Sequence, residues 1–503
     1  MRSQIKRNAL MPRSRCLTEL PALGALDRAA GSVGRQLALA LRQAIQRGEL
    51  KAGERIPSTR TLARSLGLAR ATVADVFDQL AAEGYLDARS GSGTWVSSAF
   101  GLMAPVSMTA LSAAPPAPVS LPSSALRYAA IARALSPLPA VPFSVAVPEG
   151  EAAPDDRWRR LGNRVRAGQA AALAGYSDPR GLFSLRAAIA TYLRQSRAAI
   201  AEPDNIILTE GTQQGLYLAA RVLLSPGDSA WAEDPACAGL TAVLTECGVQ
   251  TRRIPVDTQG MDVEQATRRY ADARAAFVTP SHQYPLGMPL SMGRRLALLE
   301  WARQHDSWIV EDDYDSELRY VGHPFPAMQG LDPGRVVYLG TFSKVMAPSL
   351  RLGYMVVPAA LTEAFAGARA LMGRASPLAD QHVLTAYMQE GYFEAHIRRI
   401  RTVYAERRHV LIEALQRETP WLQLEPGDQG MHLVAWLPDG VADVAVERAA
   451  HAAGLALRAL SPMYAGPTRR SGLMLGFGGF PPEALRRAVR QLRTVLTPFM
   501  TSL

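Results

Sequence analysis

The segment from Ser97 to Ser124, "SSAFGLMAPVSMTALSAAPPAPVSLPSS", constrains the architecture of this chain more than any other stretch. It is rich in Ala, Pro and Ser, and it contains no charged side chain. Its prolines interrupt any helix and no strand periodicity survives, so we expect an extended linker between a small head and a large body. The expected divisions are an N-terminal extension over residues 1–30, a head over 31–97, a linker over 98–140 and a body over 141–503.

Length and composition point to a multidomain globular protein. The chain has 503 residues with a hydrophobic content of 48%, enough for more than one core. Cys16, Cys237 and Cys247 are too few and too scattered for a disulfide framework or a zinc cluster, so we expect a reducing compartment and no metal. No apolar run approaches the ~20 residues of a membrane span, and no signal peptide pattern is present. We therefore expect a cytoplasmic protein.

The positive charge of the chain is concentrated in the head. The net charge is +10, and residues 1–97 hold fifteen Lys and Arg against eight Asp and Glu. A basic surface attracts phosphate backbones, although an excess of this size is about as common on an ordinary solvated surface. Charge alone therefore permits DNA binding by the head without establishing it.

The head has the pattern of a helix-turn-helix followed by a wing. A short helix is expected over "STRTLARSL" and a longer one over "RATVADVFDQLAAEGY", beginning near Arg70. Gly67 between them can take the left-handed conformation of the corner, and "RSGSGTW" supplies glycines for a wing turn. The simpler alternative is a three-helix packing module. The residues expected to form the core of the head are Leu62, Leu66, Val73, Phe77 and Leu80.

Residues 33–97 resemble the winged helix-turn-helix of the GntR family of bacterial transcription regulators. The segment "GERIPSTRTLARSLGLARATVADVFDQLAAEGYL" carries this resemblance, which implies binding to double-stranded promoter DNA. Ala74 stands where some members carry a base-reading arginine, so less direct readout is expected there. The residues that the resemblance places on DNA are Ser58, Arg60, Arg70 and Thr72 at the duplex, with Ser90 and Gly91 at the wing tip.

The body alternates short apolar segments with amphipathic helical ones. Examples are "NIILTE" before "GTQQGLYLAARVLL", and "AAFVTP" before "GRRLALLEWARQH". This alternation is typical of an α/β domain built on a mainly parallel sheet. After about residue 380, a long helical stretch is followed by weaker strands near "MHLVAWLP" and "GLMLGFGG", which indicates a smaller C-terminal α/β lobe.

Lys344, in "GTFSKVMAPSLRLGY", is framed by groups suited to a phosphorylated aldehyde. A neutral lysine condenses with an aldehyde, and pyridoxal phosphate is the common aldehyde that enzymes hold in this way. Thr341 and Ser343 offer hydroxyls to a phosphate, and Arg351 offers a positive fork. The turn "EGTQQG", residues 210–215, offers backbone N–H groups at a helix N-terminus to the same group.

The segment "IVEDDYD" supplies the groups that would face a pyridine ring. Asp312 and Tyr314 are two residues apart on an expected strand, so their side chains emerge on one face. A carboxylate beside the ring nitrogen keeps that nitrogen protonated, and a phenol can hydrogen-bond the ring oxygen. Taken singly, an acidic run is usually a solvated surface, so the prediction depends on the joint order of these motifs.

The body resembles a fold type I aminotransferase, and the whole chain resembles the MocR subfamily of GntR regulators. The resemblance is carried in order by "YSDPRGLFSLRAAIATYL", "TEGTQQGLYLAARVL", "TPSHQYPLGMPLS", "IVEDDYDSELRY" and "GTFSKVMAPSLRLGY". It implies that Lys344 binds pyridoxal phosphate as a Schiff base, that Asp312 pairs with the ring nitrogen and that Tyr314 bonds the ring oxygen. The residues it assigns to the phosphate are Gly211, Thr212, Gln213, Thr341, Ser343 and Arg351, with Tyr176 from the other subunit of a head-to-tail homodimer.

Several positions depart from the aminotransferase pattern. Cys237 replaces an aromatic residue that stacks on the ring, which predicts weaker cofactor binding. Tyr284 replaces an asparagine near the ring oxygen, and His282 is the expected substitute. Met474 replaces the arginine that grips a substrate carboxylate. The nearby Arg469 and Arg470 either replace that arginine or are solvated loop charges.

Three functions are compatible with this pattern. The favoured one is a transcription regulator whose body senses pyridoxal phosphate or an amine, since Met474 and Cys237 argue against efficient transamination. The second is a working aminotransferase with an appended DNA-binding head. The third is a DNA-binding scaffold that has lost the cofactor, which would make Lys344 a bystander.

Overall fold

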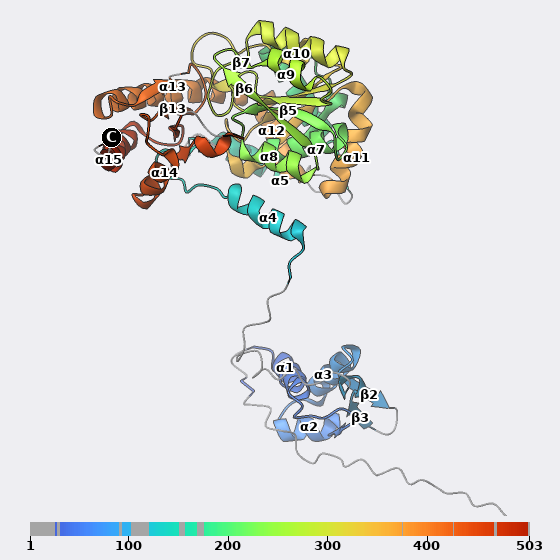
Figure 1. Cartoon of the computed structure of the whole chain (residues 1–503). Helices are drawn as coiled ribbons and strands as arrows, with labels where there is room; N and C mark the ends of the chain where they lie inside the picture. Colours follow the sequence, from blue (N-terminus) through green and yellow to red (C-terminus); the bar gives the residue numbers. More distant parts are fainter. Residues whose placement is uncertain are drawn as a thin grey trace, which may run out of the picture. The chain divides into compact units, whose positions relative to one another are not determined.

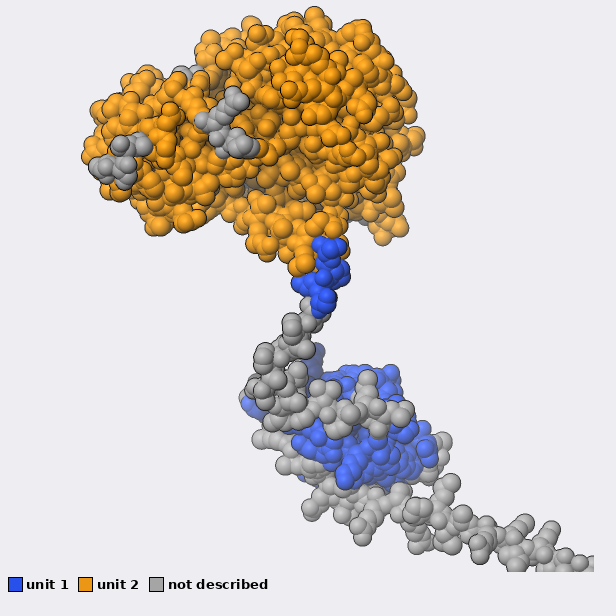
Figure 2. Space-filling view, in the orientation of Figure 1, with its two compact units in different colours: residues 1–123 blue, residues 124–503 orange. Residues whose placement is uncertain are grey.

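The computed structural model contains two compact units, residues 1–123 and residues 124–503, which Figure 2 shows in blue and orange. The expected linker, residues 98–140, therefore contains the division between them. The residues whose structure is described are 26–27, 31–89, 93–101, 120–149, 156–168, 176–374, 376–425, 427–466 and 470–500.

The first unit is a winged helix-turn-helix, as the sequence predicted (Figure 1). Its three-stranded antiparallel sheet has the order β1-β3-β2. The second helix of the motif begins at Arg70, and Gly67 takes the left-handed conformation at the corner, with φ 63°. The elements are α1 (Val33–Gln46), β1 (Arg55–Ile56), α2 (Thr59–Leu66), α3 (Arg70–Ala82), β2 (Leu86–Arg89) and β3 (Gly93–Val96).

The head is held together by one apolar cluster. Of the five residues expected to form it, Leu62, Val73, Phe77 and Leu80 are buried, and Leu66 packs against them half-buried. Residues of α1 complete the cluster, among them Leu37 and Leu41. Because this cluster fixes α3 against α1, the opposite surface of α3 is left to solvent.

The second unit is built on an eight-stranded sheet with the order β4-β11-β10-β9-β8-β5-β6-β7. The five strands from β10 to β6 in this order are parallel, and β4, β11 and β7 pair antiparallel at the two ends. The expected mainly parallel sheet is confirmed. The strands are β4 (Ile206–Thr209), β5 (Ser229–Asp234), β6 (Gln250–Asp257), β7 (Gly260–Met261), β8 (Ala275–Val278), β9 (Trp308–Asp313), β10 (Val336–Thr341) and β11 (Gly353–Val356).

Helices cover both faces of this sheet. One face packs its side chains against α7, α8 and α11, and the other packs against α9 and α10. Apart from β6 and the acidic carboxyl ends of β5 and β9, the strand residues are mostly apolar, as is typical of strands covered on both faces. The helices are α5 (Asp156–Ala167), α6 (Phe183–Arg197), α7 (Thr212–Leu223), α8 (Ala238–Glu246), α9 (Val263–Tyr270), α10 (Met292–Gln304), α11 (Thr362–Gly373) and α12 (Leu378–Gln389).

The smaller C-terminal lobe also follows the prediction. It has an antiparallel sheet of order β12-β13-β15-β14, against which α13, α14 and α15 pack (Figure 1). The long helical stretch after residue 380 is divided at Gly391, whose φ of 74° begins a new helix. The elements are α13 (Tyr392–Glu418), β12 (Gln423–Glu425), β13 (His432–Trp436), α14 (Asp443–Ala452), β14 (Arg458–Ala459), β15 (Gly472–Gly476) and α15 (Pro482–Met500).

The expected linker differs from the structure in one respect. It contains a helix, α4 (Ser123–Ala134), which belongs to the second unit from Ser124 onward. No proline lies between Pro122 and Pro137, and the alanine-rich run in that interval has high helix propensity, so the physical reason for an extended segment is missing there. Within the described ranges, no helix combines the length and the apolar character needed to cross a membrane.

Candidate functional site

A cavity in the second unit brings together four of the residues predicted to bind a cofactor, Thr212, Asp312, Tyr314 and Lys344. Strands β9 and β10 are parallel neighbours, with Asp312 beside Leu339 and Asp313 beside Gly340. Asp312 lies at the end of the first strand, Tyr314 directly follows that strand, and Lys344 lies in the turn after the second. Because the carboxyl ends of adjacent parallel strands meet at one edge of a sheet, these side chains converge there.

Other residues of the cavity were not predicted from the sequence. They come from segments far apart in the chain, so no local motif connects them. Some lie in segments that the sequence analysis singled out for other reasons, such as Glu233 in "EDPACAG", Thr279 in "TPSHQYPLGMPLS" and His432 in "MHLVAWLP". Further lining residues that sequence reasoning missed are Val145, Ala146, Glu233, Thr279, Met431 and His432.

Asp312 has the properties expected of a partner for a protonated ring nitrogen. Burial, and then the nearby Asp313, raise the pKa of Asp312 to about 7, although Lys344 opposes that rise. Its Oδ1 atom is buried and has no hydrogen-bond partner among the described residues. A buried carboxylate without a partner is costly, and a cationic ring nitrogen would supply one.

Lys344 has the properties of a reactive amine. Burial lowers its pKa, while Asp315, Asp312 and Cys237 partly oppose that change. Desolvation favours the neutral amine, which is the nucleophilic form. The donor set and the cavity therefore fit a pyridine aldehyde, with Lys344 at its aldehyde and Asp312 at its nitrogen.

The cofactor-free protein should show the effect of Asp312 on stability. The pKa of this carboxyl is about 7 in the folded protein, against 3.8 for an ordinary Asp, so its stabilising contribution is lost as the pH rises from about 4 to 7. Asp312→Asn should therefore stabilise the cofactor-free protein by on the order of 2 kcal/mol at pH 8, and the gain should vanish near pH 4. Urea unfolding at both pH values measures this difference. Asp306→Asn, at an exposed carboxyl, is the control; an equal gain at both pH values would contradict the prediction.

Residues predicted to bind the cofactor phosphate lie near the N-terminus of α7. Gly211 precedes that helix with φ 93°, a conformation that favours glycine. The Arg351 guanidinium donates from Nη2 to the Glu210 carbonyl at 2.6 Å and so lies beside this turn. Gly353, the first residue of β11, lies close to the turn at Gly211. A side chain is excluded there, because a Cβ on residue 353 would lie 2.9 Å from the Gly211 Cα. A helix N-terminus beside an arginine is a suitable site for a phosphate.

Thr341 and Ser343 lie close to this turn, and Gln213 takes part in a different contact. In the sheet, Gly353 pairs with Thr341 on one side and with Thr209 on the other, which brings Thr341 next to the start of α7. The Thr341 hydroxyl accepts from the Ser343 backbone N–H at 3.1 Å. The Gln213 side chain donates to the Gly239 carbonyl at 3.1 Å, so its amide is already occupied with α8.

Tyr176 is not brought to the cavity within this chain. Tyr176 is 82% exposed, and the Arg374 guanidinium lies 4.4 Å from the centroid of its ring. The exposed Leu371 lies near it, on α11. The structure is therefore compatible with a role in a neighbouring subunit, which stays a prediction.

Tyr314 lies in a cluster of polar and aromatic side chains. Its hydroxyl is 3.0 Å from Nδ1 of His282, and the same nitrogen is 2.9 Å from Oδ2 of Asp315. His282 and Asp315 are both buried, and their pairing leaves the Tyr314 hydroxyl proton available to another acceptor. Tyr284 also lines the cavity, and burial raises its pKa to about 12, which keeps the phenol neutral.

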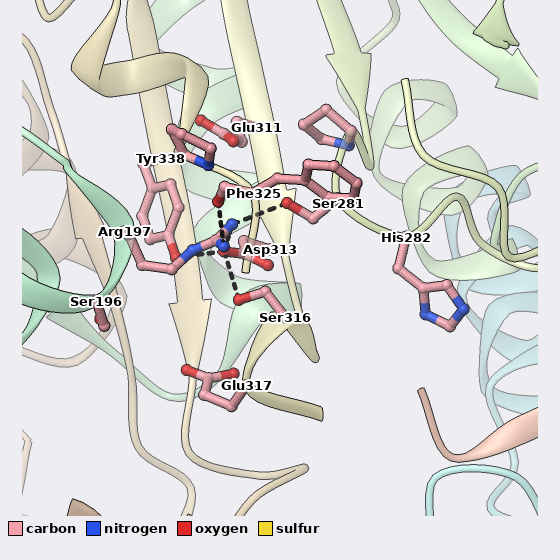
Figure 3. Close-up of polar contacts among 12 residues, drawn as sticks. Ser196, Arg197, Ser281, His282, Glu311, Asp313, Ser316, Glu317, Phe325 and Tyr338 are labelled. Carbon is pink, nitrogen blue, oxygen red and sulfur yellow. Dashed lines mark hydrogen bonds and ion pairs between the residues drawn. The ribbon is translucent and has the colours of Figure 1, made fainter. Parts of the chain in front are cut away.

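Behind the cavity, a buried network holds the end of β9 (Figure 3). Asp313 points to the opposite side of the strand from Asp312, and its Oδ2 lies 2.7 Å from Nη2 of Arg197. Arg197 also donates to the Ser281 hydroxyl at 2.8 Å and to the Phe325 carbonyl, so it connects α6 to the loop before His282. The Tyr338 hydroxyl donates to Asp313 at 2.6 Å. This network fixes the strand that carries Asp312 and Tyr314.

The departures from the aminotransferase pattern have clear positions. Cys237 lines the cavity, and burial raises the pKa of its thiol to about 11. It therefore presents a small, uncharged side chain to a ligand. Met474 is fully buried in β15. Arg470 lies 4.3 Å from the Trp436 ring centroid and donates to Gln423, and it does not line the cavity. Arg469 lies outside the described residues.

The predicted DNA contacts of the head are placed on α2 and α3. Arg60 and Arg70 are exposed, and neither forms an ion pair with another described residue. Thr72 is half-buried beside Gly34. The Ser58 hydroxyl accepts from the Thr61 N–H at 3.2 Å and so caps α2. Ser90 and Gly91 lie outside the described residues.

Comparison with known protein families divides the chain as its structure does. The family "Bacterial regulatory proteins, gntR family" matches residues 34–96, and "Aminotransferase class I and II" matches residues 141–491. A probable rhizopine catabolism regulatory protein MocR from Rhizobium meliloti is 40% identical over 95% of this chain and 96% of its own. The chain belongs to the MocR subfamily of GntR regulators.

Other relatives support both halves of this MocR-type chain. The pyridoxine biosynthesis transcriptional regulator PdxR of Corynebacterium glutamicum is 34% identical over 92% of this chain and 95% of its own. Kynurenine aminotransferase of Pyrococcus horikoshii, solved with PMP, is 26% identical and superposes with a TM-score of 0.67, covering 78% of this chain and 97% of its own. The expected fold, winged head and fold type I aminotransferase-like body, is confirmed.

Proposed function

We propose that this protein is a transcription regulator that binds promoter DNA through its head and pyridoxal phosphate through its body. The observation that carries the cofactor assignment is the position of Lys344. It is the only lysine in residues 141–503, since the chain has just two others, Lys6 and Lys51. All the other Lys or Arg positions in residues 141–503 are arginine. The single lysine lies in a cavity with Asp312, whose Oδ1 has no hydrogen-bond partner among the described residues.

Each group of the cavity has a defined task in this proposal. Pyridoxal phosphate, when bound, supplies an aldehyde that reacts reversibly with primary amines. Lys344 presents a neutral amine, and Asp312 holds a proton at the ring nitrogen. Tyr314 donates to the ring oxygen. The start of α7 and Arg351 bind the phosphate, and the network behind β9 keeps these groups in place.

The direct test is chemical attachment of pyridoxal phosphate to the purified full-length protein. We expect a visible absorption band that borohydride removes, together with a reduced adduct on Lys344 in peptide mass spectrometry. The two remaining lysines, Lys6 and Lys51, are internal controls and should carry no adduct. An adduct spread over all three lysines would show nonspecific reaction and would contradict the assignment.

The alternative function is a working aminotransferase. The shared fold and the grouping of Lys344, Asp312 and Tyr314 favour it. Against it, no arginine is among the described residues that line the cavity, and Met474 is buried where a substrate-binding arginine is expected. A multiple-turnover assay with amino donors and keto acids distinguishes the two, and turnover at ordinary enzyme rates, 1 s⁻¹ or more, would favour the enzyme.

Arg70 should contribute directly to DNA affinity. It is exposed at the first position of α3, the end of a recognition helix that reaches base edges. Arg70→Ala should weaken operator binding by about 1 to 3 kcal/mol in a gel-shift titration. Arg47→Ala removes the same charge from an exposed position just after α1 and should have a smaller effect. Equal losses of operator affinity in the two variants would show that Arg70 contributes only its positive charge and makes no specific contact with the DNA.

We also propose that the functional form is a cytoplasmic head-to-tail homodimer in which Tyr176 reaches the phosphate site of the partner. The exposed ring of Tyr176 and the exposed Leu371 beside it support a subunit contact there. A dimer carries two heads, so the operator should contain two half-sites. Footprinting that protects a single short half-site would argue against this assembly, as would a monomer in sedimentation equilibrium.

A further inference from the structure

A buried histidine in the loop after β8 lies directly behind Tyr314. The side chains of His282 and Asp315 are 3% and 1% exposed, and Nδ1 of His282 lies 2.9 and 3.0 Å from the two carboxylate oxygens of Asp315. The Tyr314 hydroxyl is 3.0 Å from the same nitrogen. Tyr314 lines the cavity of Lys344, whereas His282 is absent from the described residues that line it. Any effect of His282 on a ligand in this cavity therefore has to pass through Tyr314.

The backbone around His282 holds its imidazole in one position. A Cβ on residue 430 would lie 2.1 Å from Cε1 of the ring, and a Cβ on residue 287 would lie 3.2 Å from Nε2. Gly430 and Gly287 both have positive φ, 85° and 94°, a conformation that favours glycine. The ring is thus packed against these two turns, with Nδ1 toward Tyr314 and Asp315.

Asp315 determines which ring nitrogen of His282 carries the proton. An ionised carboxylate only accepts hydrogen bonds, so Nδ1 is protonated in both the neutral and the charged form of the imidazole. A protonated Nδ1 cannot accept, so the Tyr314 hydroxyl cannot donate to it. Burial raises the pKa of the Tyr314 phenol well above its ordinary value, so this hydroxyl keeps its proton. The proton of Tyr314 is therefore directed to another acceptor.

Loss of the carboxylate would reverse this arrangement. A neutral imidazole without Asp315 can carry its proton on Nε2 and leave Nδ1 bare. The bare Nδ1 would then accept from the Tyr314 hydroxyl, which already lies 3.0 Å away. The phenol would be satisfied within the protein and would no longer donate into the cavity.

We propose that His282 and Asp315 form a positioning pair that keeps the Tyr314 hydroxyl proton directed at the ring oxygen of pyridoxal phosphate. This inference rests on the proposed function and specifies how its site controls the acidity of the bound cofactor. The ring oxygen of the cofactor shares a proton with the nitrogen that joins it to Lys344. A hydrogen bond from Tyr314 draws negative charge from that oxygen and weakens its hold on the shared proton. The pair thereby lowers the pH at which the Lys344 adduct loses this proton.

The test is a pH titration of the visible absorption band of the full-length protein loaded with pyridoxal phosphate. Tyr314→Phe should raise the midpoint by roughly 1 to 2 pH units, because a hydrogen bond to a charged oxygen is lost. His282→Gln should raise it by about 1 pH unit, because the amide oxygen can accept from the Tyr314 hydroxyl. In the Tyr314→Phe background, His282→Gln should leave the midpoint unchanged. His409→Gln, at an exposed histidine of α13, is the matched control and should not shift the midpoint.

Asp315→Asn separates positioning from direct charge. Removal of this carboxylate lowers the midpoint in any background, because its negative charge opposes the fall in the pKa of Lys344. Loss of the proton on Nδ1 raises the midpoint only while the Tyr314 hydroxyl is present. The shift caused by Asp315→Asn should therefore be about 1 pH unit more positive in the wild type than in the Tyr314→Phe background. The other titratable groups near Tyr314 and Lys344 are unchanged in every variant, namely Glu233 on β5, Cys237 before α8, Tyr284 after β8, Asp312 on β9 and His432 on β13.

Nitrogen-15 NMR of the imidazoles supplies a readout in the cofactor-free protein. The His282 signals, identified by their loss in His282→Gln, should show the proton on Nδ1 in the wild type and on Nε2 in Asp315→Asn. A bare Nδ1 in the wild type would overturn the proposal, as would midpoint shifts that are equal with and without the Tyr314 hydroxyl. Both results leave attachment at Lys344 and operator binding intact. Absence of any borohydride-reducible band would instead overturn the proposed function, and this inference with it.

Discussion

Lys344→Ala should abolish covalent attachment of pyridoxal phosphate, with no residual borohydride-reducible band and no adduct on the protein. The body has no second lysine to substitute for it, so the loss should be complete rather than partial. The variant should still fold, because removal of a buried, desolvated amine does not remove an anchor of the core. Noncovalent affinity should remain, since the start of α7 and Arg351 are unchanged.

The decisive measurement is operator affinity with and without cofactor and amine, in both proteins. A ligand shifts a conformational equilibrium only by its differential affinity for the two states, and coupling between sites is typically about 1 to 3 kcal/mol. The wild type should therefore change its operator affinity roughly 5- to 150-fold, and Lys344→Ala should not respond. Lys51→Ala is the matched control in the head. If Lys344→Ala responds as strongly as the wild type, sensing depends on noncovalent contacts instead.

The central part of the site could be predicted because its geometry is local. Asp312 and Tyr314 are two residues apart at the end of one strand, and Lys344 follows the neighbouring parallel strand, so strand direction alone brings them together. The turn at Gly211 was predictable for the same reason, since it begins a helix after a strand. Motifs at the carboxyl ends of parallel strands converge whatever the rest of the fold does.

The remaining walls of the site could not be predicted from the sequence. Val145 precedes the first body helix, and His432 lies in β13 of the C-terminal lobe, so their meeting depends on how the lobe packs on the large sheet. Burial lowers the pKa of His432 to about 4, a property that only the assembled site creates. No local spacing relates these residues to Lys344.

The helix α4 was missed for a different reason. Composition suggested one uniform linker, yet no proline lies between Pro122 and Pro137, and this interval is a run of alanines, arginines and leucines. The start of a helix within a segment of biased composition can be predicted only when helix propensity is considered residue by residue. This helix lines a cavity together with residues of α8 and β14.

Arg197→Met should destabilise the body by about 3 to 5 kcal/mol, the largest effect expected of a substitution outside the cavity. Arg197 and Asp313 are each 1% exposed, and their ion pair has a separation of 2.7 Å. Methionine fills much of the volume but leaves the Asp313 carboxylate buried without its cation. Urea unfolding of the full chain measures the loss. Arg194→Met, on the same helix in an exposed pair with Glu202, should cost about 1 kcal/mol or less.

A second substitution separates charge from packing in this network. If the cost of Arg197→Met is an uncompensated buried charge, then adding Asp313→Asn should recover part of it, because an amide can still bond Ser316 and Tyr338 without requiring a cation. If the lost stability comes from lost packing, the destabilising effects of the two substitutions should add. The first result would also explain the position of Asp312. The charge of Asp313 is matched on one side of β9 by Arg197, so the carboxyl on the other side is free to serve a ring nitrogen.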